Sequence, residues 1–339
     1  MIALNADRTS PAQIDRAVAI LRAGGLVAFP TETVYGLGGR ALDPAALARI
    51  FAAKGRPAAH PLIAHVLGVS EARALAADWS RLADRLAEAF WPGPLTLVVP
   101  RAPCVPLELT GGGNSVGIRA PAHRIARALL QALGEPIAAP SANRYQTLSP
   151  TTAAHVAASL GDRVDLILDG GPCSAGIEST VIDLGGEAPV ILRPGALDFP
   201  TLAAVAPTLV DTTPRALDRD AERPSPGMDR RHYAPRTPLV IAPSRSAALL
   251  DAARRVADGQ RVALLLLESE ADAPHSAYAR VLGPDPGAYG RQLFAALHDL
   301  DAGGFDVIVA EPVPDTPPWR AIADRLRRAG VDGPLGAGR

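Results

Sequence analysis

A series of short apolar runs, each bounded by Gly, Pro or Asn, constrains the fold of this chain more than any other feature. Runs of this kind are typical of buried strands. Segments with helical spacing lie between them, including HRIARALLQALG and TTAAHVAASLG. This alternation predicts a mixed α/β domain over about residues 1–200. The apolar runs are LVAFP, LTLVVP, SVGIRAP, PIAAPSAN, LILDGG, STVIDL and VILRPG.

Two helices are predicted from their capping residues. Ser10 precedes Pro11 at the start of the first helix, and the pair Gly24-Gly25 ends it. The strand that follows runs into Thr31, Glu32 and Thr33, which should lie at or just beyond its end. Asp43 and Pro44 start a second helix with the same signals, and this helix should close near Lys54.

The second half of the chain has a different organisation. Residues 206–237 are rich in Pro, Arg and Asp and have little apolar periodicity, which indicates an interdomain linker. Beyond it, strand and helix patterns alternate. We therefore expect a catalytic domain over residues 1–205, a linker over 206–237 and a smaller Rossmann-like α/β domain over 238–339. That domain lacks a Gly-rich turn after its first strand, which argues against a bound dinucleotide.

Composition excludes several classes of function. The formal net charge is −1 and only 4% of the residues are aromatic. Residues 1–200 contain 17 Lys and Arg and an equal number, 17, of Asp and Glu. This balance argues against a basic surface that binds nucleic acid. Two cysteines are too few for a disulfide framework or a zinc cluster. No uncharged apolar run approaches about 18 residues and no signal peptide is visible, so we expect a cytoplasmic protein and no membrane partner.

Lys54 is the only lysine, because the 34 basic residues include 33 arginines. A lone lysine in such a chain suggests a position that needs a compact ammonium, as beside a phosphate. A surface lysine without a role is an equally plausible reading on composition alone. Arg56 follows two residues later, with the flexible Gly55 between them, and two cations on one short turn favour an anion site.

Eight motifs in order resemble the family of YrdC-type L-threonylcarbamoyladenylate synthases, over essentially all of residues 10–200. They are PTETVYGLG, KGRP, PLIAHV, WPGPLTLV, VGIRAP, APSAN, GIESTVID and ILRPG. PGMDRRHYAP resembles the linker of the long, two-domain form of this family. The resemblance implies a YrdC-like N-terminal domain with a twisted mixed sheet, helices and a concave site.

The same resemblance implies a reaction and its partners. L-threonine, bicarbonate and ATP would give threonylcarbamoyl-AMP and pyrophosphate, the first step of tRNA threonylcarbamoyladenosine biosynthesis. The product would pass to downstream tRNA threonylcarbamoyl transferase proteins, and no stable tRNA complex is expected. Mg²⁺ would be held mainly through ATP, because no cluster of carboxylates identifies a protein-built metal site.

The resemblance also assigns site residues. Lys54 and Arg56 would neutralise the triphosphate and act in catalysis. The threonine pocket would be lined by Thr31, His65, Arg119 and Ser179, with the Arg119 guanidinium on the carboxylate. Each of two residues also has a simpler interpretation. Arg119 could form a surface ion pair, and His65 could be a buried structural histidine. The ATP-binding residues would be Lys54, Arg56, Ser115, Ser141, Asn143, Ser149, Arg193, His232 and Tyr233, and the last two would lie on a lid over the nucleotide.

Other functions and roles fit these residues less well. Glu32 and Glu178 could deprotonate the threonine amine, but carboxylates beside strand ends more often bond backbone amides or an arginine, so neither receives a catalytic role. A serine hydrolase would need a nucleophile elbow, in which G-x-S-x-G forms the turn from a strand into a helix. GNSVG at residues 113–117 matches the letters of that pattern, but it leads into the predicted strand SVGIRAP and not into a helix. An RNA-binding module conflicts with the charge balance. A carbamoyl-transfer enzyme with a similar domain would carry zinc fingers, which two cysteines cannot build.

Overall fold

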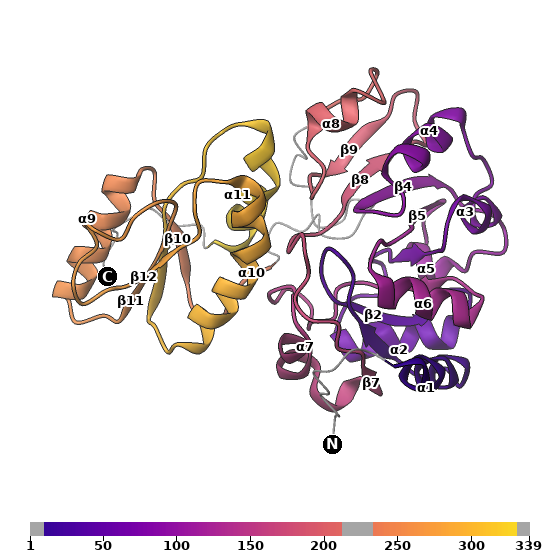
Figure 1. Cartoon of the computed structure of the whole chain (residues 1–339), viewed down its shortest axis with the longest axis horizontal. Helices are drawn as coiled ribbons and strands as arrows, with labels where there is room; N and C mark the ends of the chain where they lie inside the picture. The colour runs from indigo at the N-terminus through magenta and orange to yellow at the C-terminus, as the bar shows by residue number, and fades with distance from the viewer. Residues whose placement is uncertain (1–9, 212–232, 331–339) are drawn as a thin grey trace. The chain divides into compact units, whose positions relative to one another are not determined.

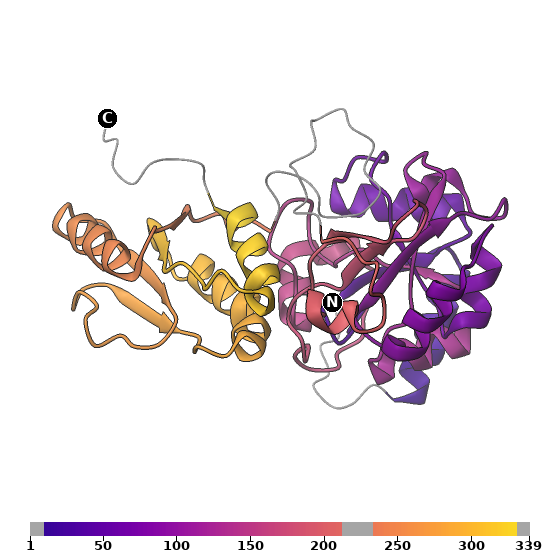
Figure 2. The ribbon, with the colours of Figure 1, turned by 90° about the horizontal axis from the view of Figure 1, so that it is seen from above.

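The computed structural model describes residues 10–211 and 233–330. These residues form two compact units. The first contains residues 10–145 and 149–211, and the second contains residues 146–148 and 233–330. Figure 1 shows the elements of each unit, and Figure 2 shows them from above.

Nine strands form one twisted sheet in the described part of the first unit. Their order across the sheet is β7-β1-β2-β6-β3-β5-β4-β8-β9. The pairs β1/β7, β3/β5 and β4/β8 are parallel and the other neighbours are antiparallel. The strands are β1 (Val27–Phe29), β2 (Gly36–Arg40), β3 (Ile63–His65), β4 (Leu95–Pro100), β5 (Ser115–Arg119), β6 (Ile137–Ala138), β7 (Leu166–Ile167), β8 (Thr180–Asp183) and β9 (Val190–Arg193).

The two helices predicted from capping residues, α1 and α2, begin and end close to those residues. Asp43 accepts hydrogen bonds from the first turn of α2, and Gly55 ends this helix in the left-handed region, at φ 63°. Ser10 and Gln13 likewise mark the start of α1. The helices are α1 (Pro11–Arg22), α2 (Pro44–Lys54), α3 (Val69–Leu75), α4 (Arg81–Phe90), α5 (Leu107–Thr110), α6 (Arg124–Leu133), α7 (Ala153–Leu160) and α8 (Phe199–Ala203), with a short 3₁₀ turn at Gly161–Arg163.

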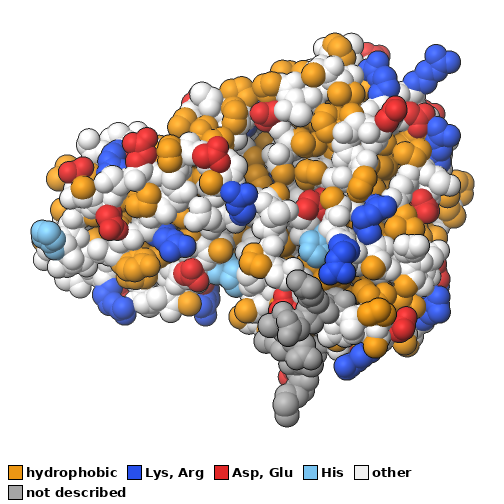
Figure 3. Space-filling model, viewed as in Figure 1, with side chains coloured by type: hydrophobic (Ala, Val, Ile, Leu, Met, Phe, Trp, Pro, Cys, Tyr) orange, Lys and Arg blue, Asp and Glu red, His pale blue; other side chains and the backbone are white. Residues whose placement is uncertain are grey.

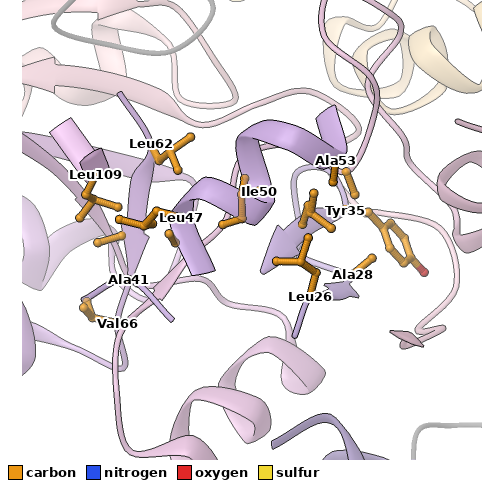
Figure 4. Packing of buried hydrophobic residues seen from close by; sticks show 14 of the residues in the cluster. Leu26, Ala28, Tyr35, Ala41, Leu47, Ile50, Ala53, Leu62, Val66 and Leu109 are labelled. Atoms are coloured by element: carbon orange, nitrogen blue, oxygen red, sulfur yellow. The ribbon is translucent and has the colours of Figure 1, made fainter. Parts of the chain in front are cut away.

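Alternate residues of β1, together with Leu26 directly before it, face two separate cores. Leu26 and Ala28 pack with α2, α3, α5 and α7 on one face, whereas Val27 and Phe29 pack with α1 and α6 on the other. Figure 4 shows the first of these cores, with the side chains of α2 beside those of the strands. The sheet is therefore covered on both faces, and polar side chains gather where its strands end.

The second unit is a parallel sheet with helices on both sides, as expected for a Rossmann-like domain. Its strand order is β10-β13-β11-β12. Helix α9 packs on one face, while α10 and α11 contact each other away from it (Figure 1). Its elements are β10 (Leu239–Ile241), α9 (Arg245–Ala257), β11 (Val262–Leu266), β12 (Tyr278–Val281), α10 (Pro286–Ala302), β13 (Val307–Ala310), a 3₁₀ turn (Pro317–Trp319) and α11 (Arg320–Ala329). The predicted α/β fold class is confirmed for both units.

Candidate active site

Sheet register brings several predicted site residues to neighbouring strand ends. His65 ends β3 directly opposite Arg119, which ends β5. On the adjoining strands, Thr180 lies opposite Leu95 at the start of β8, and Arg193 at the end of β9 lies opposite Val181. Thr31 to Thr33 follow β1, as the sequence predicted. The side chains of Glu32 and Thr33 accept hydrogen bonds from Arg119.

Arg119 and Glu32 form a buried ion pair. Nη2 of Arg119 lies 2.6 Å from Oε1 of Glu32, Nη1 donates to Oγ1 of Thr33 at 2.9 Å, and Nε donates to the Gly93 carbonyl. Burial alone would raise the pKa of Glu32. The charge of Arg119, with hydrogen bonds from Arg119 and from the Ala122 amide, lowers that pKa overall. Glu32 therefore bonds an arginine and a backbone amide, as expected, and it is ionised at neutral pH.

The hydroxyls of Thr33 and Thr31 continue this network. Their Oγ1 atoms are 2.8 Å apart, and Thr31 donates to the Val34 carbonyl at 2.6 Å. Because Arg119 donates to Thr33, the directions are consistent if Thr33 then donates to Thr31. Thr33 is a site residue that was not predicted, although it lies inside the same PTET motif as Thr31. Thr33 is two residues from Thr31, and that spacing was the signal in the sequence that could have identified it.

His65 is a buried, neutral histidine. Only 3% of its surface is exposed, and its ring meets Phe29 edge-on with centroids 6.4 Å apart. Burial, with a further contribution from the Arg119 charge, lowers the pKa of His65 to about 3. His65 can therefore offer hydrogen bonds beside Arg119 without adding charge to the cluster.

Ser179 and Arg193 form a second polar group with Thr96. Nη2 of Arg193 donates to both the carbonyl and the hydroxyl of Ser179, at 2.9 and 3.1 Å, and Thr96 Oγ1 lies 2.8 Å from that hydroxyl. Gly195 is required beside them, because a Cβ there would lie 2.3 Å from the backbone of Ser179 and Thr180. The ILRPG motif thus packs directly on GIESTVID. Thr96 was missed, although it lies in the WPGPLTLV motif.

Ser149 is also buried beside this region, where its Oγ donates to Oε1 of Glu178 at 2.6 Å. A serine directly before a proline is often a plain helix-entry residue. Helix α7 instead begins at Ala153, capped by Thr152, so Ser149 is not its cap. Glu178 directly precedes Ser179 in the chain and so connects Ser149 to the second group.

Lys54 forms the third group with Ser141 and Asn143. Its Nζ donates to the carbonyl of Ser141, to the carbonyl of Asn143 at 2.7 Å, and lies 3.4 Å from Asn143 Oδ1. The side chain is only 3% exposed. Burial, and secondarily the charge of Arg56, holds the pKa of Lys54 well below its usual range. Lys54 is therefore not the surface lysine of the alternative reading, because its ammonium is buried and binds the APSAN loop.

This geometry explains why a lysine is found here. An ammonium has three donors around one atom, and here they converge on three oxygens of a single loop. A guanidinium is planar and spreads its donors over a wide fork, which cannot match that convergence. This explanation for a lysine at position 54 needs only the protein's own oxygens and no ligand. It accounts for the one lysine in a chain with 33 arginines.

The remaining predicted residues have distinct places. Arg56 is buried, and its Nη2 donates to the Pro61 carbonyl at 2.9 Å. Ser115 is half-buried and opens β5, at the opposite end of that strand from Arg119. Tyr233 is buried in the second unit, with its ring near Phe294. His232 and most of the predicted linker lie outside the described residues.

Two broader properties concern metals and membranes. In residues 10–211 and 233–330, no group of three or more His, Cys, Asp or Glu side chains could hold a metal ion. Among the same residues, no helix has both the length and the apolar character to cross a membrane.

On the face shown in Figure 3, acidic and basic side chains are scattered among hydrophobic ones.

Comparisons with known proteins give consistent matches along the chain. Residues 19–195 match the Sua5/YciO/YrdC family, described as telomere recombination, and residues 200–330 match the domain described as threonylcarbamoyl-AMP synthase, C-terminal domain. The chain is 41% identical over 333 residues to the threonylcarbamoyl-AMP synthase of Pyrococcus abyssi, covering 95% of each chain. Identity to the Bacillus subtilis threonylcarbamoyl-AMP synthase is also 41%, over 329 residues, covering 95% of this chain and 94% of the relative.

A solved structure also resembles the whole chain. The crystal structure of Pyrococcus abyssi Sua5 complexed with L-threonine superposes with a TM-score of 0.90 at 40% identity, covering 95% of each chain.

Proposed function

This chain belongs to the Sua5/YciO/YrdC family, and on that premise we propose that it is a threonylcarbamoyl-AMP synthase that uses L-threonine, bicarbonate and ATP and releases pyrophosphate. The observation that carries the proposal is the 41% identity, over 95% of the chain, to relatives of that name. The likeness to a relative complexed with L-threonine supports threonine as the amino acid.

The proposed chemistry proceeds in two steps. The neutral threonine amine attacks the carbon of bicarbonate, a C–N bond forms, and water leaves to give a carbamate. An oxygen of the carbamate then attacks the α-phosphorus of ATP, and the bond to the β-phosphate oxygen breaks with release of pyrophosphate. No covalent bond to the protein is needed, so positioning and electrostatic stabilisation carry the catalysis.

Arg119 is the proposed anchor of the threonine carboxylate. Three of its five N–H groups are engaged by Gly93, Thr33 and Glu32, and a carboxylate would meet the remaining ones. Glu32 holds the guanidinium in place. Its lowered pKa makes it a weak base, so we assign it positioning of Arg119 and not deprotonation of the amine.

Thr31, His65 and Ser179 are the proposed neutral partners of threonine. Thr31 and His65 lie beside Arg119 in the same polar cluster, and the uncharged state of His65 adds no charge to a bound zwitterion. Ser179 would join them from the second group, where Arg193 holds both its carbonyl and its hydroxyl.

The ATP side is proposed to involve Lys54, Arg56, Ser141, Asn143 and Arg193, with Ser115, Ser149, His232 and Tyr233 as further predicted contacts. Lys54 and the APSAN loop act there as one unit, because the ammonium holds the loop carbonyls. The described residues offer no metal cage. Mg²⁺ therefore remains a prediction as an ion carried by ATP, and no step is derived from it.

The direct test measures pyrophosphate release with ATP, bicarbonate and one amino acid at a time. We expect a signal that requires both threonine and bicarbonate, and that falls at least tenfold in Arg119→Met through a higher KM for threonine. Arg49→Met is the matched control, because Arg49 is a half-exposed arginine on α2 that bonds Gly24 and Asp165. Release of pyrophosphate that is independent of threonine would contradict the proposal.

The proposed partners follow from the product. A mixed anhydride of a carbamate and a phosphate hydrolyses readily, so it should pass quickly to a downstream tRNA threonylcarbamoyl transferase. We expect no stable complex of this chain with tRNA, and a tight complex that persists at high salt would contradict that expectation.

A further inference from the structure

Thr96 and Ser179 share one hydrogen bond in the second polar group, and the hydrogens of this pair can be counted. Oγ1 of Thr96 lies 2.8 Å from Oγ of Ser179, and either hydroxyl can donate to the other. The Ser179 oxygen also accepts from Nη2 of Arg193 at 3.1 Å. Neither hydroxyl has a further partner among the residues that the structure describes. The two hydroxyls carry two hydrogens and the bond between them uses one, so the other meets no acceptor in the described chain.

The hydroxyls of Thr31 and Thr33 have no such surplus. Arg119 donates to Thr33, which can donate to Thr31, and Thr31 donates to a backbone carbonyl. Each hydroxyl hydrogen of that series therefore has an acceptor within the protein. The pair of Thr96 and Ser179 differs, although Thr96 is 0% exposed and Ser179 only 1%. Because a buried donor normally has an acceptor, the surplus hydrogen points to an acceptor on a ligand.

The Thr96 side chain lies on the same face of the sheet as Arg119. Leu97 in β4 lies opposite Ile118 in β5. Successive side chains of a strand alternate between faces, so the neighbouring residues Thr96 and Arg119 both extend from the opposite face. A Cβ at Gly117 would lie 3.5 Å from Cγ2 of Thr96, which agrees with this placement because Gly117 and Arg119 are two positions apart in β5. The surplus hydrogen therefore lies on the face that carries the proposed anchor of the threonine carboxylate.

We propose that Thr96 is a positioning residue that aims the hydroxyl hydrogen of Ser179 at the side-chain hydroxyl of the amino-acid substrate. Thr96 and Arg193 both donate to the Ser179 oxygen, so the hydrogen of Ser179 is the one that is directed at the substrate. The amine of threonine is the nucleophile and its carboxylate is assigned to Arg119, so its hydroxyl oxygen is the acceptor that remains. Valine has a methyl group in that place and would leave the hydrogen unpaired. This inference rests on the proposed function for the identity of the substrate.

The first test measures the Kd for L-threonine by calorimetry, without ATP, in full-length variants of Thr96. Thr96→Val keeps the shape of the side chain and removes its hydroxyl, so Kd should rise roughly 3- to 10-fold, the equivalent of one ordinary hydrogen bond. Thr96→Ser keeps the hydroxyl and loses the methyl that packs over Gly117, so it should bind threonine about as tightly as the wild type even where its Tm is lower. If Thr96 were only structural, the serine variant would bind threonine no better than the valine variant, and that result would overturn the inference.

A double-mutant cycle tests whether Thr96 acts through Ser179. In a Ser179→Ala background, Thr96→Val should change the Kd for threonine by less than about twofold, whereas additive effects of the two substitutions would contradict the proposed role. Thr110→Val is the matched control, because the Thr110 hydroxyl is also buried but donates to the Gly113 carbonyl at 2.8 Å, within its own loop. That variant should lose stability and keep the wild-type Kd for threonine.

Pyrophosphate release with L-threonine or L-valine tests which atom accepts the hydrogen. The wild type should prefer threonine by at least about 100-fold in kcat/KM, because valine leaves a buried donor unpaired. Thr96→Val should lower that preference by roughly 3- to 10-fold, and an unchanged preference would overturn the inference. A wild type that binds threonine but releases no pyrophosphate would refute the proposed function, and the calorimetric cycle would still decide the role of Thr96. A wild type that binds no threonine would refute both.

Discussion

Replacing Lys54 by methionine tests whether this lysine is a structural clamp as well as a site residue. Methionine matches the length of the side chain but removes the ammonium that binds the Ser141 and Asn143 oxygens. If Lys54 served only a ligand, activity would fall and stability would not change. The observed bonds predict that both fall, because the APSAN loop loses a buried cationic donor.

The expected size follows from the bonds that are lost. Each hydrogen bond from a charged donor contributes about 1.5–3 kcal/mol to stability, and Lys54 makes two short ones and one long one. Part of that is offset, since the lowered pKa shows that burial disfavours the charged ammonium. We expect a net loss of about 2–4 kcal/mol in the free energy of unfolding. At about 2–4 °C per kcal/mol, Tm should fall by roughly 5–15 °C.

The assay combines calorimetry with pyrophosphate release. Arg49→Met is the control on the same helix, because its exposed ion pair should contribute less than about 1 kcal/mol. Lys54→Arg should resemble Lys54→Met in stability, since the fork cannot reach the same three oxygens. A Lys54→Met protein that retains the wild-type Tm but loses activity would refute the clamp and leave only a ligand role.

Three further outcomes are expected. Glu32→Gln should lower the free energy of unfolding by about 3–5 kcal/mol and raise KM for threonine, because it leaves the buried Arg119 charge uncompensated; a stability change below about 1 kcal/mol in urea unfolding would argue against the pair. Gly195→Ala should destabilise by about 2–4 kcal/mol, whereas Gly186→Ala, with its nearest contact at 3.7 Å, should stay within about 1 kcal/mol, as thermal melts can show. His65 binds a proton below about pH 6.5 when unfolded but only near pH 3 when folded, so unfolding free energy should fall as pH drops through that window; between pH 6.5 and 4.5, urea titrations should show a loss about 2–3 kcal/mol larger in the wild type than in His65→Gln.

Local signals in the sequence predicted the elements well. The caps at Ser10 and Asp43, the glycines after the first two helices and the short apolar runs each act within a few residues, and the corresponding helices and strands are present. The predicted placement of Thr31 and its neighbours beyond β1 is confirmed for the same reason. Residues close together in the chain determine these features, so one sequence is enough to predict them.

The partners of the site residues could not be predicted in this way. Glu32 and Arg119 are 87 residues apart, and Lys54 and Ser141 are also 87 apart. Such pairs depend on which strands become neighbours and in what register, and apolar periodicity does not encode that order. The pattern could name Arg119 as a candidate cation, but only the sheet brings Glu32 to it.

Tyr233 shows a second limit of reasoning from sequence. The family resemblance implies that Tyr233 contacts ATP, and that role remains a prediction. Its observed site is a buried pocket beside Arg325 and Phe294, far along the chain. Neither residue belongs to a motif that identifies it as a partner for tyrosine, so no local signal was available.

The polar atoms of the candidate site are held largely by one another. Arg119 is fixed by Glu32, Ser179 by Arg193, and the APSAN loop by Lys54. Mutual bonding of this kind keeps donors oriented before a substrate arrives, which is the condition for electrostatic catalysis without reorganisation. It also requires charges to be buried at a cost in solvation, and the apolar cores on both faces of the sheet supply the stability that offsets this cost. Stability and activity are therefore coupled at these positions, and only comparisons with matched variants outside the network can separate them.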